Sequence, residues 1–279
     1  MSSSSQPSYA GYVDPNFPNP GGENSAPIII YGYTPSLIVC VLGLALFALA
    51  LPIHVYLLIR HRTWYFSTVV VGTAMELVGY SFRTLSSQRN PYSVSYFVGQ
   101  YFFIITAPVF YSAAIYAIVS VLINTYGRRH APLPPVAVLA IFIACDVVAT
   151  VVQVTGAALV GAAYSNERDP TGPNNILLAG LAFQVFAFFI FLLVLAATLF
   201  KGQRNSSERV PVSFLLALVA ATCAVYLRTC FRLAETAEGL MQKLSTNEVF
   251  FGCLEFAPIV VAVYLFTYWH PGRWLSASI

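Results

Sequence analysis

Charged residues are scarce in this chain. Of its 279 residues only 9% are Asp, Glu, Lys or Arg, whereas 58% are hydrophobic. A soluble domain carries about 25% charge, so this chain has too few charges to cover a water-facing surface of its size. The formal net charge of +3 is also spread along the sequence, which leaves no basic patch for nucleic acid. The composition predicts an integral membrane protein.

Groups that support several familiar activities are also missing. The sequence has no G-x-x-x-x-G-K-[ST] phosphate-binding loop and no G-x-S-x-G nucleophile elbow, so we expect neither ATP use nor serine hydrolysis by this chain. The five cysteines form no C-x-x-C pair and are predicted to pack among apolar residues. Of the four histidines only His54 falls in a long apolar run, whereas a zinc site needs several ligands. We therefore predict no cofactor, no metal site and no enzymatic activity.

Long apolar runs are abundant. A helix needs about 20 apolar residues to cross a hydrocarbon core of about 30 Å. The sequence therefore predicts an all-α polytopic membrane protein with a bundle of seven transmembrane helices and its termini on opposite sides. The predicted spans are 35–59, 64–84, 95–124, 134–162, 175–200, 210–233 and 247–269.

The distribution of basic residues predicts the orientation of the bundle. Residues 1–34 contain neither Lys nor Arg and are expected to form a flexible extracellular tail, with Tyr31 and Tyr33 as anchors at the membrane interface. The transmembrane domain covers 35–269, and 270–279 form a short cytoplasmic tail. The positive-inside rule places the more basic loops in the cytoplasm. Their basic residues are Arg60, Arg62, Arg128, Arg129, Lys201, Arg204, Arg209 and Arg273.

Polar side chains recur inside the predicted spans at a spacing of seven residues, as in Glu76 with Arg83. Seven residues are nearly two helical turns, about 10.5 Å along one face, so the two members of a pair point in one direction at two depths. Charge at membrane depth is costly and marks a candidate functional site. Counting from the span ends gives a middle layer of Glu76, Asp146, Gln184 and Glu255, an outer layer of Arg83, Gln153, Arg228 and Glu248, and Arg232 and Glu235 one turn beyond.

These layers predict an acidic floor under a mostly basic rim, in a cavity open to the outside or to the outer leaflet. All of these residues except Glu248 are candidate substrate-binding residues. Structural alternatives stay open for several of them. Arg232 and Glu235 can lie at headgroup level, and Arg228 can pair with Glu255 or Glu76 to hold the bundle together. The two glutamines can instead be partners in an interhelical hydrogen bond.

Proline interrupts two predicted spans in similar contexts. The third span contains "TAPVFYSAAIY" with Pro108, and the seventh contains "FAPIVVAVYLF" with Pro258. A proline inside a helix frees a carbonyl and bends the axis, so we predict that Pro108 and Pro258 are kink or gating positions. The match suggests a parallel repeat of three spans, one connecting span and three spans. A chance match is the alternative.

Six motifs occur in the order found in one protein family. They are "YGYTPS" (31–36), "MELVGYSFR" (75–83), "APVFYSAAIY" (107–116), "DVVATVVQVTG" (146–156), "RTCFRLAETAEG" (228–239) and "HPG" (270–272). Over residues 31–272 the chain resembles the fungal RTA-like lipid-translocating exporter family. The resemblance implies a seven-span plasma-membrane protein associated with aminosterol resistance and with efflux of sphingoid bases.

The resemblance also marks individual positions in this chain. One departure is Val121, where the family usually has an arginine, which implies a difference in gating or substrate. The marked positions are Glu76, Gly79, Tyr80, Arg83, Pro108, Tyr116, Asp146, Gln153, Gly156, Arg228, Arg232, Glu235, Gly239 and Glu255.

The leading hypothesis is a transporter or translocator of amphiphilic lipids, with membrane lipids or amphiphilic small molecules as its partners. An amine headgroup suits the acidic floor, and an anionic headgroup suits the basic rim. Proton coupling through Glu76 or Asp146 is a further hypothesis, because a low-dielectric site favours the neutral carboxyl group.

Two other classes of protein fit the sequence less well. A seven-span receptor for a lipid or stress signal fits the number of spans, but the chain lacks D-R-Y after the third span and N-P-x-x-Y in the seventh. A retinal photosensor needs a lysine in a span, and the only lysines are Lys201 and Lys243, both in predicted loops. An intramembrane lipid hydrolase is less favoured, because His54 is the only histidine in a span.

Overall fold

The computed structural model describes residues 12–17, 25–165, 169–205, 210–239 and 242–275. The parts of the predicted tails at 1–11, 18–24 and 276–279 lie outside the described residues, as do Arg168 and Arg209. The long helices are α1 (Leu37–His61), α2 (Ser67–Gln88), α3 (Val94–Tyr126), α4 (Pro135–Ser165), α5 (Thr171–Asn205) and α6 (Val212–Glu238). The last long segment consists of α7 (Glu248–Phe250), a π-helical turn η3 (Phe251–Phe256) and α8 (Ala257–Tyr268), followed by the short α9 (Pro271–Trp274).

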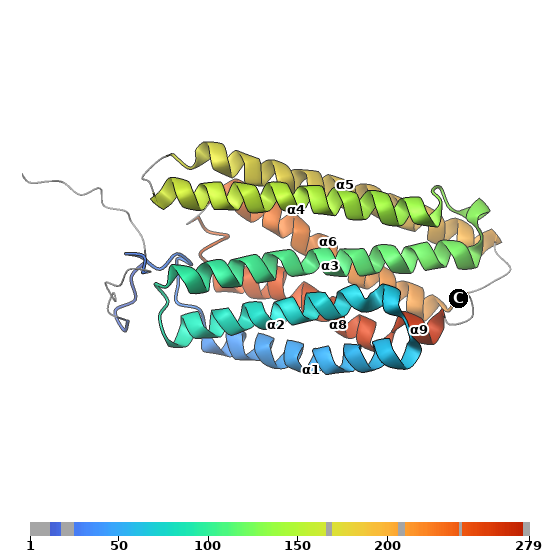
Figure 1. Ribbon diagram of the computed structural model, residues 1–279, viewed down its shortest axis with the longest axis horizontal. Coiled ribbons are helices and arrows are strands. Elements are labelled where there is room, and N and C mark those ends of the chain that lie inside the picture. Colours follow the sequence, from blue (N-terminus) through green and yellow to red (C-terminus); the bar gives the residue numbers. More distant parts are fainter. Residues whose placement is uncertain (1–11, 18–24, 166–168, 206–209, 240–241, 276–279) are drawn as a thin grey trace, which may run out of the picture.

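The helices run side by side along the long axis of the molecule (Figure 1). Helices α4 and α5 pack together on one side, α1 and α2 lie on the other, and α3 lies between them. Helix α6 packs against α8 and α5. We call the end of the bundle at which α1 begins the N-terminal end, and the end that carries α9 the C-terminal end.

Six of the described helical segments are long and apolar enough to cross a membrane. The further helix, α2, has 22 residues, about 33 Å, but it is less apolar because it carries polar residues such as Glu76 and Arg83. Within the described residues, an isolated bridge between Ser25 and Ser93 is the only β pairing. The prediction of an all-helical polytopic membrane protein is confirmed.

Glycines allow two helix pairs to approach closely. A Cβ added at Gly79 of α2 would lie 2.6 Å from Ile104 Cγ1 of α3, and one at Gly156 of α4 would lie 2.5 Å from the backbone nitrogen of Leu177 of α5. Both positions therefore have no room for a larger side chain. The close contact of α2 with α3 positions the buried charges described below.

Residues 12–17 and 25–36 pack on the N-terminal end of the bundle, and we call them the N-terminal cap. The Ala26 N–H donates to the Tyr92 carbonyl at 2.9 Å. The Asp14 N–H donates to the Tyr92 hydroxyl at 3.2 Å. These bonds join the cap to the turn between α2 and α3.

Substitution of Gly156 tests the packing of α4 against α5. Gly156→Ala forces these helices apart, and we expect a loss of about 1–3 kcal/mol from overpacking. The measurement is the thermal denaturation midpoint of the detergent-solubilised protein. Gly172→Ala is the control, because its Cβ would meet no heavy atom of the described residues within 4 Å. Equal midpoints for the two variants would contradict this packing.

Acidification tests the cap through Asp14. The Thr34 hydroxyl donates to Asp14 Oδ2 at 2.5 Å and the Asn16 N–H donates to Oδ1 at 2.8 Å. These bonds, with Thr34 the larger cause, hold the pKa of Asp14 below its ordinary value of 3.8. The carboxylate therefore stabilises the cap fully above that value, and this contribution is lost as the pH falls through the lowered pKa.

We expect amide hydrogen exchange in residues 29–34, corrected for the intrinsic rate, to accelerate when wild-type protein is acidified below pH 4. Asp14→Asn shows the faster exchange already at neutral pH. Asp169→Asn, which changes an exposed carboxylate at the start of α5, is the control and leaves exchange in the cap unchanged. Slow exchange in Asp14→Asn at neutral pH would show that this carboxylate does not hold the cap.

Candidate functional site

The polar side chains of the long helices lie inside the bundle, where they meet one another in four groups. Glu235 is half-buried. The other candidates, Glu76, Arg83, Asp146, Gln153, Gln184, Arg228, Arg232 and Glu255, are each at most 8% exposed. The expected opening of this polar layer toward the outside stays a prediction, because these side chains are engaged with each other in this conformation.

Arg228 of α6 is at the centre of the first group. Its Nη2 atom lies 2.5 Å from Glu255 Oε1 and donates to the Ile104 carbonyl of α3 at 3.0 Å. Glu76 of α2 lies close enough to interact electrostatically with both Arg228 and Glu255. We call Glu76, Arg228 and Glu255 the central triad. One of the alternatives open from the sequence, the pairing of Arg228 with Glu255, is therefore observed.

Two prolines shape the surroundings of Arg228. Pro108 has no N–H, so the carbonyl four residues earlier, that of Ile104, loses its helical partner. Arg228 supplies the missing donor. Pro258 follows the π-helical turn that contains Glu255, and such turns are frequent at functional sites. Both irregular segments thus present an acceptor to one guanidinium, while their gating role stays a prediction.

Arg83 of α2 forms the second group at the N-terminal end. Its Nη2 atom donates to the Tyr33 hydroxyl at 2.8 Å and lies 3.1 Å from Glu248 Oε1. Its guanidinium carbon is 3.9 Å from the centre of the Phe251 ring, a cation–π contact. Glu248 Oε1 also accepts the Ser36 N–H at 2.9 Å. We call Tyr33, Arg83 and Glu248 the N-terminal latch, because they tie the start of α1 to α2 and α7.

The position of Tyr33 corrects its predicted role as a membrane anchor. Its hydroxyl is a partner of Arg83 inside the protein. Burial raises the pKa of Tyr33, so the phenol stays protonated at neutral pH. Tyr31 is only 6% exposed and its ring centre lies 5.6 Å from the Arg83 guanidinium carbon. Tyr31 is therefore buried in the cap, and Tyr33 is half-buried beside Arg83.

The third group is an ion pair within α6. Arg232 Nη1 lies 2.5 Å from Glu235 Oε2, and the Arg232 guanidinium carbon is 5.0 Å from the centre of the Tyr101 ring of α3. Because Arg232 is 8% exposed, its side chain is directed into the bundle.

The fourth group joins α4 to its neighbours. The Tyr116 hydroxyl of α3 donates to Asp146 Oδ2 at 3.0 Å. Gln153 Nε2 donates to Gln184 Oε1 of α5 at 2.9 Å. The glutamines are therefore an interhelical hydrogen-bonded pair in this conformation.

These pairings correct the depths inferred from the predicted span ends. The span ends predict Gln153 in the outer layer and Gln184 in the middle layer, yet the two bond directly. They also predict Arg228 above Glu255, yet the two form an ion pair. The reason is that α6 continues to Glu238 and α4 to Ser165, beyond the predicted ends at 233 and 162. Each residue of error in a helix end shifts the inferred depth by about 1.5 Å.

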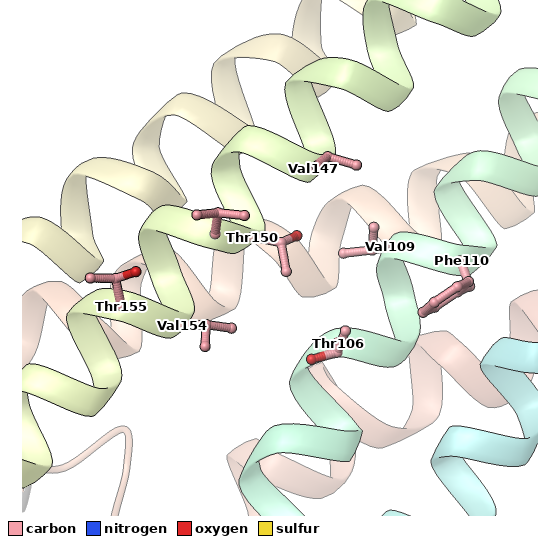
Figure 2. A pocket seen from close by; sticks show the side chains of 8 residues that line it. Thr106, Val109, Phe110, Val147, Thr150, Val154 and Thr155 are labelled. Atoms are coloured by element: carbon pink, nitrogen blue, oxygen red, sulfur yellow. The ribbon is translucent and has the colours of Figure 1, made fainter.

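An apolar crevice of about 370 Å³ lies between α3 and α4. Figure 2 shows side chains from both helices facing this space. Its volume is within the range of about 300–1,000 Å³ typical of ligand pockets. Thr150 of the crevice lies one turn after Asp146 on α4, and its hydroxyl donates to the Asp146 backbone carbonyl at 2.7 Å. Its lining residues are Thr106, Val109, Phe110, Val147, Thr150, Val151, Val154 and Thr155.

Some residues of the polar groups were not among the predicted site residues. Tyr33, Gln100 and Tyr101 contact the arginines, with Gln100 Oε1 3.4 Å from Arg83 Nη1. The "YGYTPS" motif contains Tyr33 and was one available signal. The Ile104 carbonyl could have been found from Pro108, which lies four residues after it.

Comparisons with known proteins show several relatives. A family model described as RTA1 like protein matches residues 69–278. The sphingoid long-chain base transporter RSB1 of Saccharomyces cerevisiae is 28% identical over 279 residues, which cover 86% of this chain and 73% of the relative. The probable lipid transporter atnI of Emericella nidulans is 25% identical over 287 residues, covering 96% and 71%. Protein RTA1 of Saccharomyces cerevisiae is 23% identical over 273 residues, covering 85% and 83%. No solved structure matches the chain.

The central triad predicts a large and non-additive effect on stability. Arg228→Met leaves two buried carboxylates without their guanidinium, and we expect a loss of about 3–5 kcal/mol. The double variant Arg228→Met/Glu255→Gln regains part of this loss, because a single carboxylate then remains. The measurement is equilibrium unfolding in mixed detergent–SDS micelles.

The control for this series is Arg89→Met, which changes an exposed arginine and stays within about 0.5 kcal/mol of wild type. Independent, additive losses for the two triad substitutions would argue against direct pairing.

Proposed function

The chain belongs to the RTA1-like family, and we propose that it moves amphiphilic lipids across a membrane. Two relatives are named as a sphingoid long-chain base transporter and a probable lipid transporter, which favours transport over catalysis. A sphingoid base combines an alkyl chain with an amine headgroup, so an amine-bearing amphiphile is the proposed substrate. The observation that carries the proposal is the central triad, two carboxylates and an arginine buried among membrane-length helices. Charge at this depth marks substrate or ion pathways.

We place the N-terminal end of the bundle outside the cell and the C-terminal end in the cytoplasm. The basic residues Arg83, Arg228 and Arg232 face carboxylates inside the bundle, so they do not count as loop charges in the positive-inside rule. The loop and helix-end residues at the C-terminal end are strongly basic. They are Arg60, Arg62, Arg128, Arg129, Lys201, Arg204 and Arg273. The plasma membrane is the proposed location.

The proposed topology includes α2 as a seventh crossing. Its length matches the membrane, and its polar residues face neighbouring helices, as Arg83 does in the latch. The proposed repeat relates α3 and its Pro108 to α8 and its Pro258. The convergence of both segments on Arg228 supports a shared role in bending the bundle around the central triad.

We propose that the substrate spans the apolar crevice and the polar layer. The crevice between α3 and α4 is suited to an alkyl chain, because its lining is mainly valine, threonine and phenylalanine side chains. Asp146, on the same helix as most of the crevice lining, and Glu76 in the central triad are the proposed acceptors for an amine. Opening of the N-terminal latch would connect this layer to the outside. The proposed contacts are Glu76, Arg83, Asp146, Gln153, Gln184, Arg228, Arg232, Glu235 and Glu255.

Flux of a fluorescent long-chain amino alcohol in vesicles with purified protein tests this function. We expect wild-type protein to accelerate transfer between leaflets. Glu76→Gln and Asp146→Asn each lower the rate by about tenfold to a hundredfold, because a hydrogen bond to a charged group contributes about 1.5–3 kcal/mol. Glu238→Gln changes an exposed carboxylate and leaves the rate unchanged.

Two outcomes would contradict the proposal. Absence of flux with wild-type protein would contradict lipid movement, and ligand-dependent recruitment of a cytoplasmic protein would then favour a receptor. Unchanged flux in both Glu76→Gln and Asp146→Asn would remove these carboxylates from the pathway.

A further inference from the structure

The central triad differs in its charge from the two other groups that contain an arginine. The N-terminal latch and the pair Arg232–Glu235 each combine one arginine with one carboxylate. The triad combines one arginine with two carboxylates, and its members are 2%, 5% and 2% exposed for Glu76, Arg228 and Glu255. With all three groups ionised, it would hold one uncompensated negative charge.

The hydrogen bonds of the triad are also incomplete. Glu255 Oε2 is buried and has no hydrogen-bond partner among the described residues, and the same is true of Arg228 Nε. Glu76 interacts electrostatically with both Arg228 and Glu255. A buried carboxylate without donors is costly unless it is neutralised. Within the described part of the chain Glu255 Oε2 therefore lacks a donor, and the single guanidinium of Arg228 faces two carboxyl groups, an arrangement that favours binding of a proton or a cation.

Among the described residues, the groups that surround Glu76 do not supply the missing positive charge. Tyr80 of α2 and Tyr111 of α3 are the titratable neighbours that interact with it in addition to the triad, and both are neutral phenols. Farther out, Glu235 and Arg232 both interact with Glu255, but their opposite charges cancel. Arg83 interacts with Tyr80 and is paired with Glu248. The additional positive charge therefore has to come from outside the protein.

We propose that the triad holds one exchangeable proton on Glu76 and releases it when a cationic amine binds in its place. This inference rests on the proposed function for the identity of the amine. In the exchange, the Glu76 O–H bond breaks, the proton passes to water, and the ammonium group of the substrate pairs with the carboxylate. One positive charge replaces another, so the interior keeps its charge balance.

The backbone around the triad is suited to such an exchange. Glu255 lies in a π-helical turn directly before Pro258, and the acceptor of Arg228 on α3 is the carbonyl freed by Pro108. Both acceptors of Arg228 therefore lie in segments where the regular α-helical hydrogen bonding is interrupted. Arg228 can therefore shift relative to Glu255 as the substrate replaces the proton. The coupling makes the movement of the amine an exchange against protons.

Infrared spectroscopy of the purified protein in vesicles tests whether Glu76 holds a proton, and it needs no measurement of transport. In a protein that carries Asp146→Asn, which removes the other buried carboxyl group without an arginine partner, we expect the band of one protonated carboxylic acid at pH 7 and its loss when Glu76→Gln is added. The band is also lost in Glu255→Gln, because Glu76 then ionises as the sole carboxylate facing Arg228. Glu238→Gln retains it. Absence of the band in the Asp146→Asn protein, or its persistence when Glu76→Gln is added to that protein in its folded state, would overturn the proposal.

Two measurements on wild-type protein test the exchange itself. Addition of sphinganine in weakly buffered solution should release one proton per bound molecule, and binding without release would overturn the exchange. In vesicles, a gradient of one pH unit should change the distribution of sphinganine between leaflets about tenfold, relative to protein-free vesicles. Flux that is the same with and without the pH gradient would refute the coupling of amine movement to protons but leave the proposed function intact. Absence of flux would contradict the proposed function. The infrared measurement would still show whether Glu76 holds a proton.

Discussion

The two bonds of Arg228 hold together much of the interior of this bundle. A guanidinium carries five donors and cannot be deprotonated, so a helix that buries it needs acceptors on its neighbours. The chain provides them where helices are irregular, at the carbonyl freed by Pro108 in α3 and at Glu255 in the turn before α8. Because an arginine that loses its partner is strongly destabilising, these contacts restrict how α3, α6 and α8 slide along one another.

The N-terminal end also contains a buried arginine that needs acceptors from neighbouring segments, but here they come from the cap and α7. Arg83 lies near the end of α2, and the cap and α7 bring Tyr33 and Glu248 to it. The cap is therefore an integral part of the fold, because it covers a charge that α2 alone would leave exposed. The latch connects the cap to α7, which leads directly into the π-helical turn with Glu255. A change at the cap is thus linked through a short continuous segment to the central triad.

The lengths of the apolar runs were sufficient to predict the helices, because hydropathy depends on the residues of each run and not on which helices pack against it. The pairing of polar residues was less accessible to sequence reasoning. Arg228 and Glu255 were both recognised as buried candidates, but their relative depth depends on where α6 ends, and helices continue beyond their apolar residues. Tyr33 was misassigned because an aromatic residue next to a span is equally typical of an interface anchor and of a folded cap. The opening of the polar layer cannot follow from sequence, since it depends on how several helices move together.

The buried ion pairs do not by themselves argue for stability. Replacing such a pair with apolar side chains of similar volume is often neutral or stabilising, and a bundle surrounded by lipid could be held by apolar contacts alone. A neutral pair such as Arg232 with Glu235 can serve to orient helices. The central triad cannot be explained in this way, because its second carboxylate adds charge without adding a partner. An unbalanced carboxylate in the interior favours a bound proton or cation, and a group that holds either in exchange is suited to moving an amine.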